Sequence, residues 1–338
     1  MAGPRVTAVV LAFGESPHLV DAVTTLLDSR DVDLEVIVVD NGGAGAALAQ
    51  LRPFDGVRII GDGRNLGYTG GVNLGASSAA GDHLAFVNSD AIVAPDALSA
   101  LVAALADDEV ALASGSVRLA DRPELINSAG NPVHYSGLSW AGGLGTPASQ
   151  WPAADITAAS GALMMTRTST WQELGGLYEP MFAYMEDTEL SLRCWQRGWR
   201  VRYVPEAVAT HHYEFSRHAR KFQLLERNRL LMVATLWPAR LLMVAAPVLV
   251  GLELAMTLVA LRDGWLRHKA TGWLWLWRHR REVIARRRDL RAARVIDDRA
   301  FAALLVGDVT PGEGLGLTVP ALARTASRAY WRLVRRLL

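Results

Sequence analysis

The chain has 338 residues, of which 51% are hydrophobic and 20% are charged, and its formal net charge is +1. This composition excludes intrinsic disorder for most of the chain, because it provides enough apolar side chains for a large core. The single cysteine, Cys194, excludes a disulfide framework and any metal cluster built from cysteines.

The charge is divided unevenly along the chain. Residues 1–210 hold 12 Arg, no Lys and 24 acidic residues, a net of −12. Residues 211–338 hold 21 Arg, 2 Lys and 10 acidic residues, a net of +13. An acidic front and a basic back predict two surfaces with different partners.

The front of the chain alternates short apolar runs with helical patterns. We expect strands at Val6–Ala12, Leu34–Val39, Val57–Ile60, His83–Val87 and Val110–Val117. We expect helices at Pro17–Ser29, Ala44–Leu51, Tyr68–Ala80 and Pro95–Ala106. Such alternation predicts an α/β fold with a mostly parallel sheet flanked by helices. The first apolar run is too short for a secretory signal, so we expect the front in the cytosol.

The pattern changes after the fifth strand. Residues 118–155 are rich in Gly, Pro, Ser and Trp, which predicts loops and a hairpin. We then expect a strand at Ile156–Thr166, helices at Thr168–Leu174 and Glu186–Gln196, and a strand at Trp199–Val204. Beyond about Arg220 the chain is helical and Arg-rich. We therefore divide it into a domain over 1–220 and a helical region over 221–338.

Four polar clusters follow the predicted strands. They are Asp40-Asn41-Gly42, Gly63–Gly67, Asn88-Ser89-Asp90 and the stretch around His211. In an open α/β sheet ligands bind beyond the carboxyl ends of the strands. Each cluster alone is also typical of an ordinary turn, but four at one edge favour a binding site.

Two of these features suggest metal chemistry. A carboxylate such as Asp90 at the end of a strand can hold Mg²⁺ or Mn²⁺, which bridges phosphates. The alternative for this cluster is an Asx turn that leads into the next helix. His211 could complete the metal site opposite Asp90, although a His pair is more often a surface feature.

The helix expected at Glu186 begins with adjacent carboxylates. Their position at a helix start is stabilised by the helix dipole, which is the structural alternative to a catalytic role. Glu186 or Asp187 could instead accept a proton from an attacking hydroxyl. We interpret Glu189 and Arg193 as an i,i+4 ion pair on the surface.

Taken in order, these motifs resemble the inverting family 2 glycosyltransferases, which have the GT-A fold. The resemblance covers about residues 5–230 and is nearest to rhamnosyltransferase-like enzymes of bacterial cell-wall and surface polysaccharide synthesis. It rests on Val6–Phe13, Val38–Gly42, Asn65–Asn73, Asn88–Asp90, Ser160–Ala162, Glu186-Asp187, and His211 with Ser216. One departure is Asn88, since the metal motif holds one Asp rather than two.

The resemblance implies a role for each matching residue. Those implied to bind the nucleotide and donor sugar are Ala12, Phe13, Asp40, Asn65, Gly67, Asn73, Asn88, Ser89, Asp90, Gly161 and Ala162. Asp187 would be the general base, with Glu186 supporting it. Asp90 and His211 would hold a divalent metal on the diphosphate.

The reaction implied is transfer of a sugar from a nucleotide-diphospho-sugar to a lipid-linked (polyprenyl diphosphate) glycan acceptor. By resemblance the first donor to consider is dTDP-rhamnose. A sugar nucleotidyltransferase is an alternative, but it would carry a basic Gly-rich loop where this chain has Gly14–Pro17. A non-catalytic scaffold is a further alternative, which the full set of rim carboxylates disfavours.

The basic back predicts association with a membrane. Leu241–Leu261 is long enough to span a bilayer, and its only charge is Glu253. The Arg-rich stretch 278–294 prefers the cytosolic side, so we favour a helix or shallow hairpin in the cytosolic leaflet. Four Trp between 265 and 277 suit the headgroup level, and the arginines suit anionic lipid.

We therefore expect a peripheral protein on the cytoplasmic face of the bacterial membrane. The alternative is a buried helix pair that packs on the catalytic domain or on a second subunit as a homodimer. Nucleic acid is not an expected partner, because no recognised nucleic-acid module accompanies the basic run.

Overall fold

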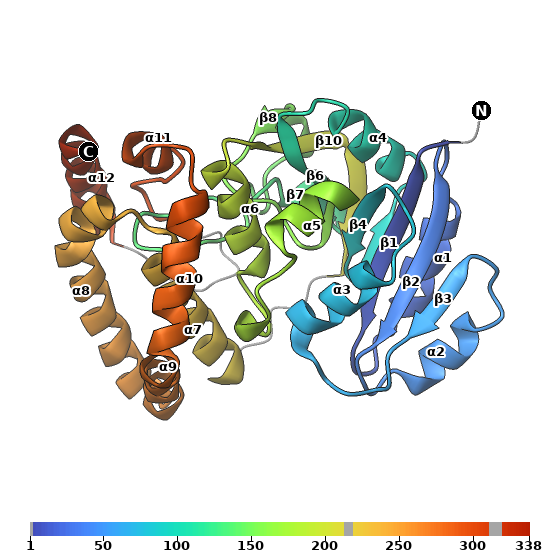
Figure 1. Cartoon of the computed structure of the whole chain (residues 1–338), viewed down its shortest axis with the longest axis horizontal. Helices are drawn as coiled ribbons and strands as arrows, with labels where there is room; N and C mark the ends of the chain where they lie inside the picture. The colour runs from blue at the N-terminus through green and yellow to red at the C-terminus, as the bar shows by residue number, and fades with distance from the viewer. Residues whose placement is uncertain (1–2, 213–218, 311–319) are drawn as a thin grey trace. The chain divides into compact units, whose positions relative to one another are not determined.

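The structure is a computed structural model that describes residues 3–212, 219–310 and 320–338. The chain forms two compact units (Figure 1). The sheet unit comprises Met1–Asn131, Ala141–Cys194 and Trp199–Glu214. The helical unit comprises Pro132–Trp140, Trp195–Gly198 and Phe215–Leu338.

A single sheet organises the sheet unit. Its described strands are β1 (Arg5–Ala12), β2 (Asp33–Asp40), β3 (Val57–Ile60), β4 (His83–Val87), β5 (Ala91–Val93), β6 (Val110–Leu119), β7 (Arg122–Ser128), β8 (Ala154–Asp155), β9 (Leu163–Arg167) and β10 (Arg200–His211). The helices are α1 (Leu19–Leu27), α2 (Gly45–Leu51), α3 (Gly67–Ser77), α4 (Ala97–Ala104), α5 (Thr168–Leu174) and α6 (Glu186–Gln196). The predicted α/β sheet flanked by helices is confirmed.

The sheet combines parallel and antiparallel pairs of strands. Its order is β3-β2-β1-β4-β9-β6-β10-β5, with β7 beside β6 and β8 beside β10. The first four strands in this order run parallel up to β4, whereas β9 is antiparallel to both β4 and β6. Helices join the early parallel strands, and a tight turn joins β6 to β7, which makes that pair antiparallel.

Alternating residues of β1 explain how helices cover both faces. Val6, Val10 and the other even-numbered residues belong to the core that contains Leu19 and Val23 of α1. The opposite face of β1 packs against α3, at a point where α3 has a glycine. A Cβ on Gly71 would lie 2.2 Å from Leu11 Cδ1, so glycine lets this helix approach the strand without displacing the Leu11 side chain.

Two sequence predictions about strands need correction. The strand expected at Ile156–Thr166 begins only at Leu163, and the residues before it form turns and loop. The strand expected to end at Val204 continues to His211, because β5 pairs antiparallel with its last residues. β5 has three residues, too few for a periodic signal.

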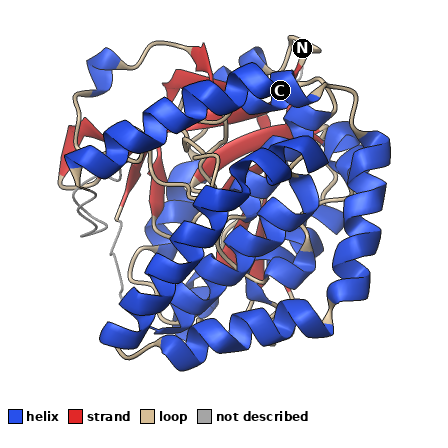
Figure 2. Ribbon diagram, turned by 90° about the vertical axis from the view of Figure 1, so that its left-hand side faces the viewer, coloured by secondary structure: helices blue, strands red, loops and turns tan. Residues whose placement is uncertain are grey.

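The helical unit consists largely of helices, as Figure 2 shows. They are α7 (Ala219–Leu236), α8 (Ala239–Arg262), α9 (Leu266–Arg278), α10 (Arg280–Ala293), α11 (Asp298–Ala303) and α12 (Ala321–Leu337). Glu253, the carboxylate within apolar α8, contacts Arg229 at 2.6 Å, Lys269 at 2.8 Å and Trp273 Nε1 at 2.6 Å. Its charge is thus compensated by side chains of α7 and α9.

Candidate active site

Three parallel strands end at one edge of the sheet. Ala12 pairs with Asp40 across β1 and β2, and Val10 pairs with Val87 across β1 and β4. Asn88 directly follows Val87. Carboxyl ends of parallel strands are where α/β folds place ligand-binding groups. The polar residues predicted after these strands therefore gather at one rim.

Asp40 and its neighbour Asn41 organise the first part of this rim. Asp40 Oδ1 accepts a hydrogen bond from the Gly42 amide at 3.1 Å. Asn41 is buried, and its side chain accepts from the Leu66 amide at 2.8 Å and donates to the Gly67 carbonyl at 3.3 Å. Asn41 thus fixes the loop that leads into α3, a structural role that we did not assign to it from the sequence.

The predicted nucleotide-binding residues around α3 have different surroundings. Asn65 lies exposed at the rim, and its Oδ1 accepts from the Gly67 amide at 2.9 Å. Asn73 exchanges hydrogen bonds with the backbone of Leu177, both at 2.9 Å, and donates to Glu179 Oε1 at 3.2 Å. Asn73 thus connects α3 to the segment that contains Leu177 and Glu179, and its implied nucleotide role stays a prediction.

The end of β1 and the residue before Asp90 complete this part of the rim. Ala12 is fully buried, and its carbonyl accepts from the Asn41 amide at 2.9 Å. Phe13 is 56% exposed, so its ring is free to stack on a ligand. The Ser89 carbonyl accepts from the Ser16 hydroxyl at 3.4 Å, which ties the loop after β4 to the loop after β1.

Asp90 and His211 meet at this rim as predicted. The pairing of β5 with β10 places His211 opposite Ala91, and the His212 amide donates to the Asp90 carbonyl at 3.0 Å. His211 Nε2 lies 2.9 Å from Asp90 Oδ1 and 3.5 Å from Asn88 Nδ2. His211 is buried, while the Asp90 side chain is 33% exposed.

The donor set of this pair fits a divalent cation that is shared with a ligand. His211 Nδ1 lies 3.2 Å from the Asn127 amide oxygen and Nε2 lies 2.9 Å from a carboxylate oxygen of Asp90, so both ring nitrogens face acceptors. When Nδ1 donates to Asn127, Nε2 is left to share a cation with this carboxylate. No third His, Cys, Asp or Glu of the described residues joins this pair to form a metal-binding group. Mg²⁺ and Mn²⁺ sites completed by water and phosphate oxygens need only such a small protein set.

Gly161 and Ala162 connect this pair to the predicted base. The Asn88 amide donates to the Ala162 carbonyl at 3.2 Å, and the Gly161 amide donates to Asp187 Oδ2 at 3.0 Å. The Tyr68 hydroxyl donates to the Gly161 carbonyl at 3.3 Å. The two predicted halves of the site thus belong to one hydrogen-bonded rim.

Four donors surround the Asp187 carboxylate. Oδ2 accepts from Gly161 N and from Asn131 Nδ2 at 3.3 Å, and Oδ1 accepts from the amide and hydroxyl of Thr188 at 2.6 and 3.2 Å. Asp187 is partly exposed. Glu186 differs: it is buried, and its Oε2 has no hydrogen-bond partner among the described residues.

These environments affect the pKa values of the two carboxyls differently. Burial, followed by the charge of Asp187, raises the pKa of Glu186 to about 8. Burial also raises the pKa of Asp187, but hydrogen bonds from Gly161 and Thr188 oppose that shift. A hydrogen-bonded carboxylate keeps its charge more easily than an unpartnered one. At neutral pH we therefore place the proton on Glu186 and the charge on Asp187.

Replacing Glu186 by Gln should remove a pH dependence of stability. Between pH 4.5 and about 8 the folded chain retains a proton that the unfolded chain releases. The stability from this group is complete below pH 4.5 and is lost as the pH rises towards 8, by up to about 1.4 kcal/mol per unit. Urea unfolding should show Glu186→Gln gaining stability over wild type across that window.

The exposed Glu124 provides the matched control. Glu124→Gln should follow the pH dependence of the wild-type protein. Parallel pH curves for wild type and Glu186→Gln would contradict the assignment of the buried proton.

Tyr68 is a site residue that sequence reasoning missed. Burial raises its pKa well above the ordinary value, and the charges of Glu186, Asp187 and Asp90 raise it further. Its hydroxyl therefore stays protonated and can donate a hydrogen bond beside all three carboxyls. Its place at the start of α3, directly after Gly67, was the available signal.

The segment before Glu186 has an unusual backbone. Phe182, Tyr184 and Met185 all have positive φ, between 65° and 70°. Such conformations are costly for non-glycine residues and persist where neighbouring contacts impose them. The Thr69 amide provides one such contact, because it donates to the Phe182 carbonyl at 3.1 Å.

Gly67→Ala should disturb this segment. Gly67 has φ +73°, and a Cβ there would lie 2.4 Å from the Phe182 carbonyl oxygen. We expect a loss of at least about 1 kcal/mol in unfolding free energy, together with reduced activity. Thermal unfolding measures the first effect. Gly45→Ala is the matched control, because a Cβ at Gly45 meets nothing within 4 Å, and equal effects of the two changes would contradict the prediction.

One sequence interpretation was wrong. Glu189 and Arg193 form the expected pair at 2.8 Å, but their side chains are only 2% and 5% exposed. Arg193 also donates to the carbonyls of Leu174 and Gly176, both at 2.7 Å. The pair is therefore a buried connection between α6 and the end of α5. Ser216, which completes the motif with His211, lies outside the described residues.

Comparison with known families identifies the chain. Residues 7–173 match the family described as Glycosyl transferase family 2. The chain belongs to glycosyltransferase family 2. The region that matches the family 2 profile contains Asp40, Asp90 and Gly161, whereas Glu186, Asp187 and His211 lie beyond it.

Two curated proteins illustrate the relationship within family 2. The chain is 29% identical over 237 residues to the N-acetylglucosaminyl-diphospho-decaprenol L-rhamnosyltransferase of Mycobacterium tuberculosis, and the match covers 60% of this chain and 75% of the relative. It is 38% identical over 101 residues to the succinoglycan biosynthesis protein ExoO of Rhizobium meliloti, which covers 29% of each chain.

Solved glycosyltransferase structures share the fold of this family 2 chain. GalNAc-T7, solved with UDP, GalNAc and Mn²⁺, aligns with a TM-score of 0.58 at 18% identity, over 70% of this chain and 48% of that chain. The mannosyltransferase PcManGT of Pyrobaculum calidifontis, solved with GDP-Man and Mn²⁺, aligns with a TM-score of 0.52 at 16% identity, over 99% and 86%. The predicted GT-A fold is confirmed.

Proposed function

We propose that this glycosyltransferase moves a sugar from a nucleotide diphosphate to a lipid-linked glycan, with inversion at the anomeric carbon. The first donor that we propose is dTDP-L-rhamnose, and the acceptor is a polyprenyl-diphosphate glycan. The relative from Mycobacterium tuberculosis, named for rhamnosyl transfer to a decaprenyl-diphosphate sugar, supports this choice.

One observation carries the proposal: a partly exposed, hydrogen-bonded Asp187 lies on the same rim as Asp90 and His211. A base needs a carboxylate that keeps its charge and that the substrate can reach, and the hydrogen bonds and partial exposure of Asp187 favour both conditions. Gly161, which donates to that carboxylate, also connects it to the loop of Asp90 through Ala162. This arrangement supports a proton acceptor at one end and a diphosphate site at the other end of one short hydrogen-bonded path.

The proposed reaction is a single displacement. Asp187 takes the proton of an acceptor hydroxyl while the oxygen of that hydroxyl forms a bond to the anomeric carbon. The bond from that carbon to the diphosphate oxygen breaks, and the nucleoside diphosphate leaves from the opposite face. Neutral Glu186 keeps a second negative charge out of this region, and the protonated Tyr68 hydroxyl holds the Gly161 carbonyl in place.

Asp90 and His211 are the residues that would hold a divalent metal. Bound there, Mg²⁺ or Mn²⁺ would neutralise charge that develops on the departing diphosphate. Asn127 would keep His211 in the tautomer whose Nε2 is able to bind the ion.

Protection against thermal unfolding tests the donor assignment. The full chain is heated with a panel of nucleotide sugars, with and without Mn²⁺. We expect dTDP-rhamnose to raise the melting temperature more than other donors, and only with the metal. Stabilisation by a different nucleotide sugar would overturn the donor assignment. An unchanged melting temperature with every donor would favour a non-catalytic scaffold.

We also propose that the helical unit associates with the membrane that holds the acceptor. By length and composition α8 could cross a membrane, because its most apolar stretch has a mean hydropathy of 2.2 and is only 6% buried. Its exposed apolar residues include Met243, Val250, Leu254, Leu258 and Leu261. They recur at helical spacing and form one face, which suits a helix that lies in a lipid surface.

Leu258→Glu should weaken this association. Leu258 is 68% exposed, so the change should leave the fold intact while it places a charge on the apolar face. We expect liposome flotation to show at least about a tenfold loss of partitioning. Val295, which is 71% exposed and lies outside α8, provides the matched control Val295→Glu. Equal flotation of both variants and wild type would contradict the role of α8.

A further inference from the structure

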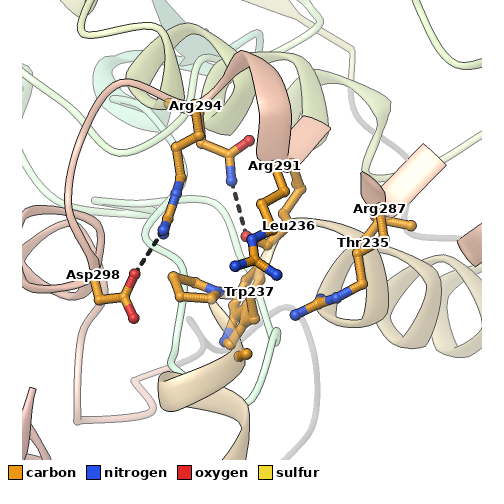
Figure 3. A pocket seen from close by; sticks show the side chains of 10 residues that line it. Thr235, Leu236, Trp237, Arg287, Arg291, Arg294 and Asp298 are labelled. Atoms are coloured by element: carbon orange, nitrogen blue, oxygen red, sulfur yellow. Dashed lines mark hydrogen bonds and ion pairs between the residues drawn. The ribbon is translucent and has the colours of Figure 1, made fainter. Parts of the chain in front are cut away.

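The helical unit contains a pocket that the transfer reaction does not use. It has a volume of about 170 Å³ and lies between the end of α7, the start of α8 and the basic helix α10. Figure 3 shows the guanidinium groups of Arg287, Arg291 and Arg294 around it, with Asp298 beside Arg294. Among the described residues that line the pocket, Asp298 is the only acidic one. The pocket therefore carries an excess of positive charge.

The three arginines are held to different degrees. Arg287 donates to the Ala234 carbonyl at 2.6 Å, and Arg294 Nη2 contacts Asp298 at 2.7 Å. Arg294 Nη1 is buried and has no partner among the described residues. Arg291 is exposed, and its side chain makes no hydrogen bond or ion pair with the part of the chain that the structure describes. Two of the three cations thus have unused donors at this pocket.

Electrostatics favour an anion between these groups. Burial lowers the pKa of Arg287, and the positive charges of Arg291 and Arg294 lower it further. Guanidinium groups that repel one another in this way are stabilised by a multivalent anion, and their planar forks match phosphate oxygens. The pocket also contains Pro238 and Ala239, at the N-terminus of the 24-residue helix α8, where the helix dipole adds positive potential.

The position of the pocket on α8 indicates what kind of phosphate it suits. The exposed apolar face of α8 begins at Met243, one turn after Ala239. It continues to Leu261, a length of about 33 Å from Ala239. A phosphate group at the start of this helix would therefore have an apolar surface beside it for a hydrocarbon chain.

We propose that this arginine pocket binds a phosphate group, either the headgroup of an anionic lipid or a free phosphate. The site is separate from the rim of Asp90 and Asp187, because all residues that line it belong to the helical unit. Its affinity depends on Arg291, the cation with the most unused donors.

Binding of two probes to the full chain tests this site, with EDTA present so that the metal site at Asp90 makes no contribution. The soluble probe is inorganic pyrophosphate, followed by titration calorimetry. The lipid probe is a phosphatidylcholine vesicle with or without phosphatidic acid, followed by flotation. Arg291→Gln removes the unpaired cation. Arg288→Gln, an exposed arginine on the same helix that pairs with Asp289 outside the pocket, is matched in charge.

We expect Arg291→Gln to weaken binding by about tenfold or more, while Arg288→Gln leaves it near wild type. Arg291→Lys should retain part of the binding, because it keeps the charge but loses the fork. Saturable pyrophosphate binding would identify a free-phosphate site, and a response to phosphatidic acid alone would identify a lipid headgroup site. Equal losses in Arg291→Gln and Arg288→Gln, or no binding of either probe by wild type, would overturn the proposal.

Discussion

Asp187→Asn is expected to abolish nearly all sugar transfer while the protein still binds its donor. The carboxamide keeps the shape of the side chain but cannot take a proton from the acceptor hydroxyl. A positioned base typically contributes roughly 10²- to 10⁴-fold to the rate, so we expect a loss in this range. Transfer is measured as sugar incorporated into lipid-linked acceptor, and donor binding is measured by thermal protection.

Two features make this prediction specific. Asp187 accepts from Gly161 N, so the Asn variant must orient its own oxygen towards that amide to keep the loop in place. Asp108 is exposed and distant from Asp187 in the sequence, so Asp108→Asn provides the same chemical change as a control. Retained transfer in Asp187→Asn would contradict the base assignment, and lost donor binding would indicate a structural role instead.

His211→Asn is expected to remove the metal dependence of donor binding. The change removes Nε2, which lies 2.9 Å from Asp90 Oδ1. Loss of a group that merely orients a metal ligand costs about 10- to 100-fold in metal affinity, so loss of the ligand itself should cost more. The loss of metal affinity in Asn127→Ala should be about 10- to 100-fold, because Asn127 acts on the metal only through His211.

The neighbouring histidine provides the control for this series. His212 is exposed, and its ring stacks on His18 at 3.8 Å. His212→Asn should leave Mn²⁺-dependent thermal protection by the donor unchanged. The same protection in His211→Asn as in wild type would contradict the proposed metal site.

Much of the front half could be predicted because its signals are local. The apolar runs that became β3 and β4 matched the observed strands, and helical spacing identified α5 and α6 residue for residue. The rule that ligands bind beyond strand ends then predicted that Asp40 and Asp90 lie at one rim of the sheet. These inferences need only the periodicity of side chains and the direction of the strands.

The parts that could not be predicted depend on contacts between distant segments. Asn127 reaches His211 because β7 folds back on β6 with shifts in register, which no local pattern reveals. Tyr68 reaches the carboxyls through Gly161, 93 residues away. The spacing of Glu189 and Arg193 predicted a pair but not the burial of that face, because i,i+4 spacing is the same on either side of a helix.

The most direct test of this account is the stereochemistry of transfer by the wild-type chain. The purified protein is incubated with Mn²⁺, a polyprenyl-diphosphate-linked N-acetylglucosamine and dTDP-rhamnose, and the anomeric configuration of the new linkage is determined by NMR. We predict a product whose configuration is opposite to that of the donor. A product with retained configuration would contradict the single displacement at Asp187, and no transfer from any nucleotide sugar would contradict the proposed function.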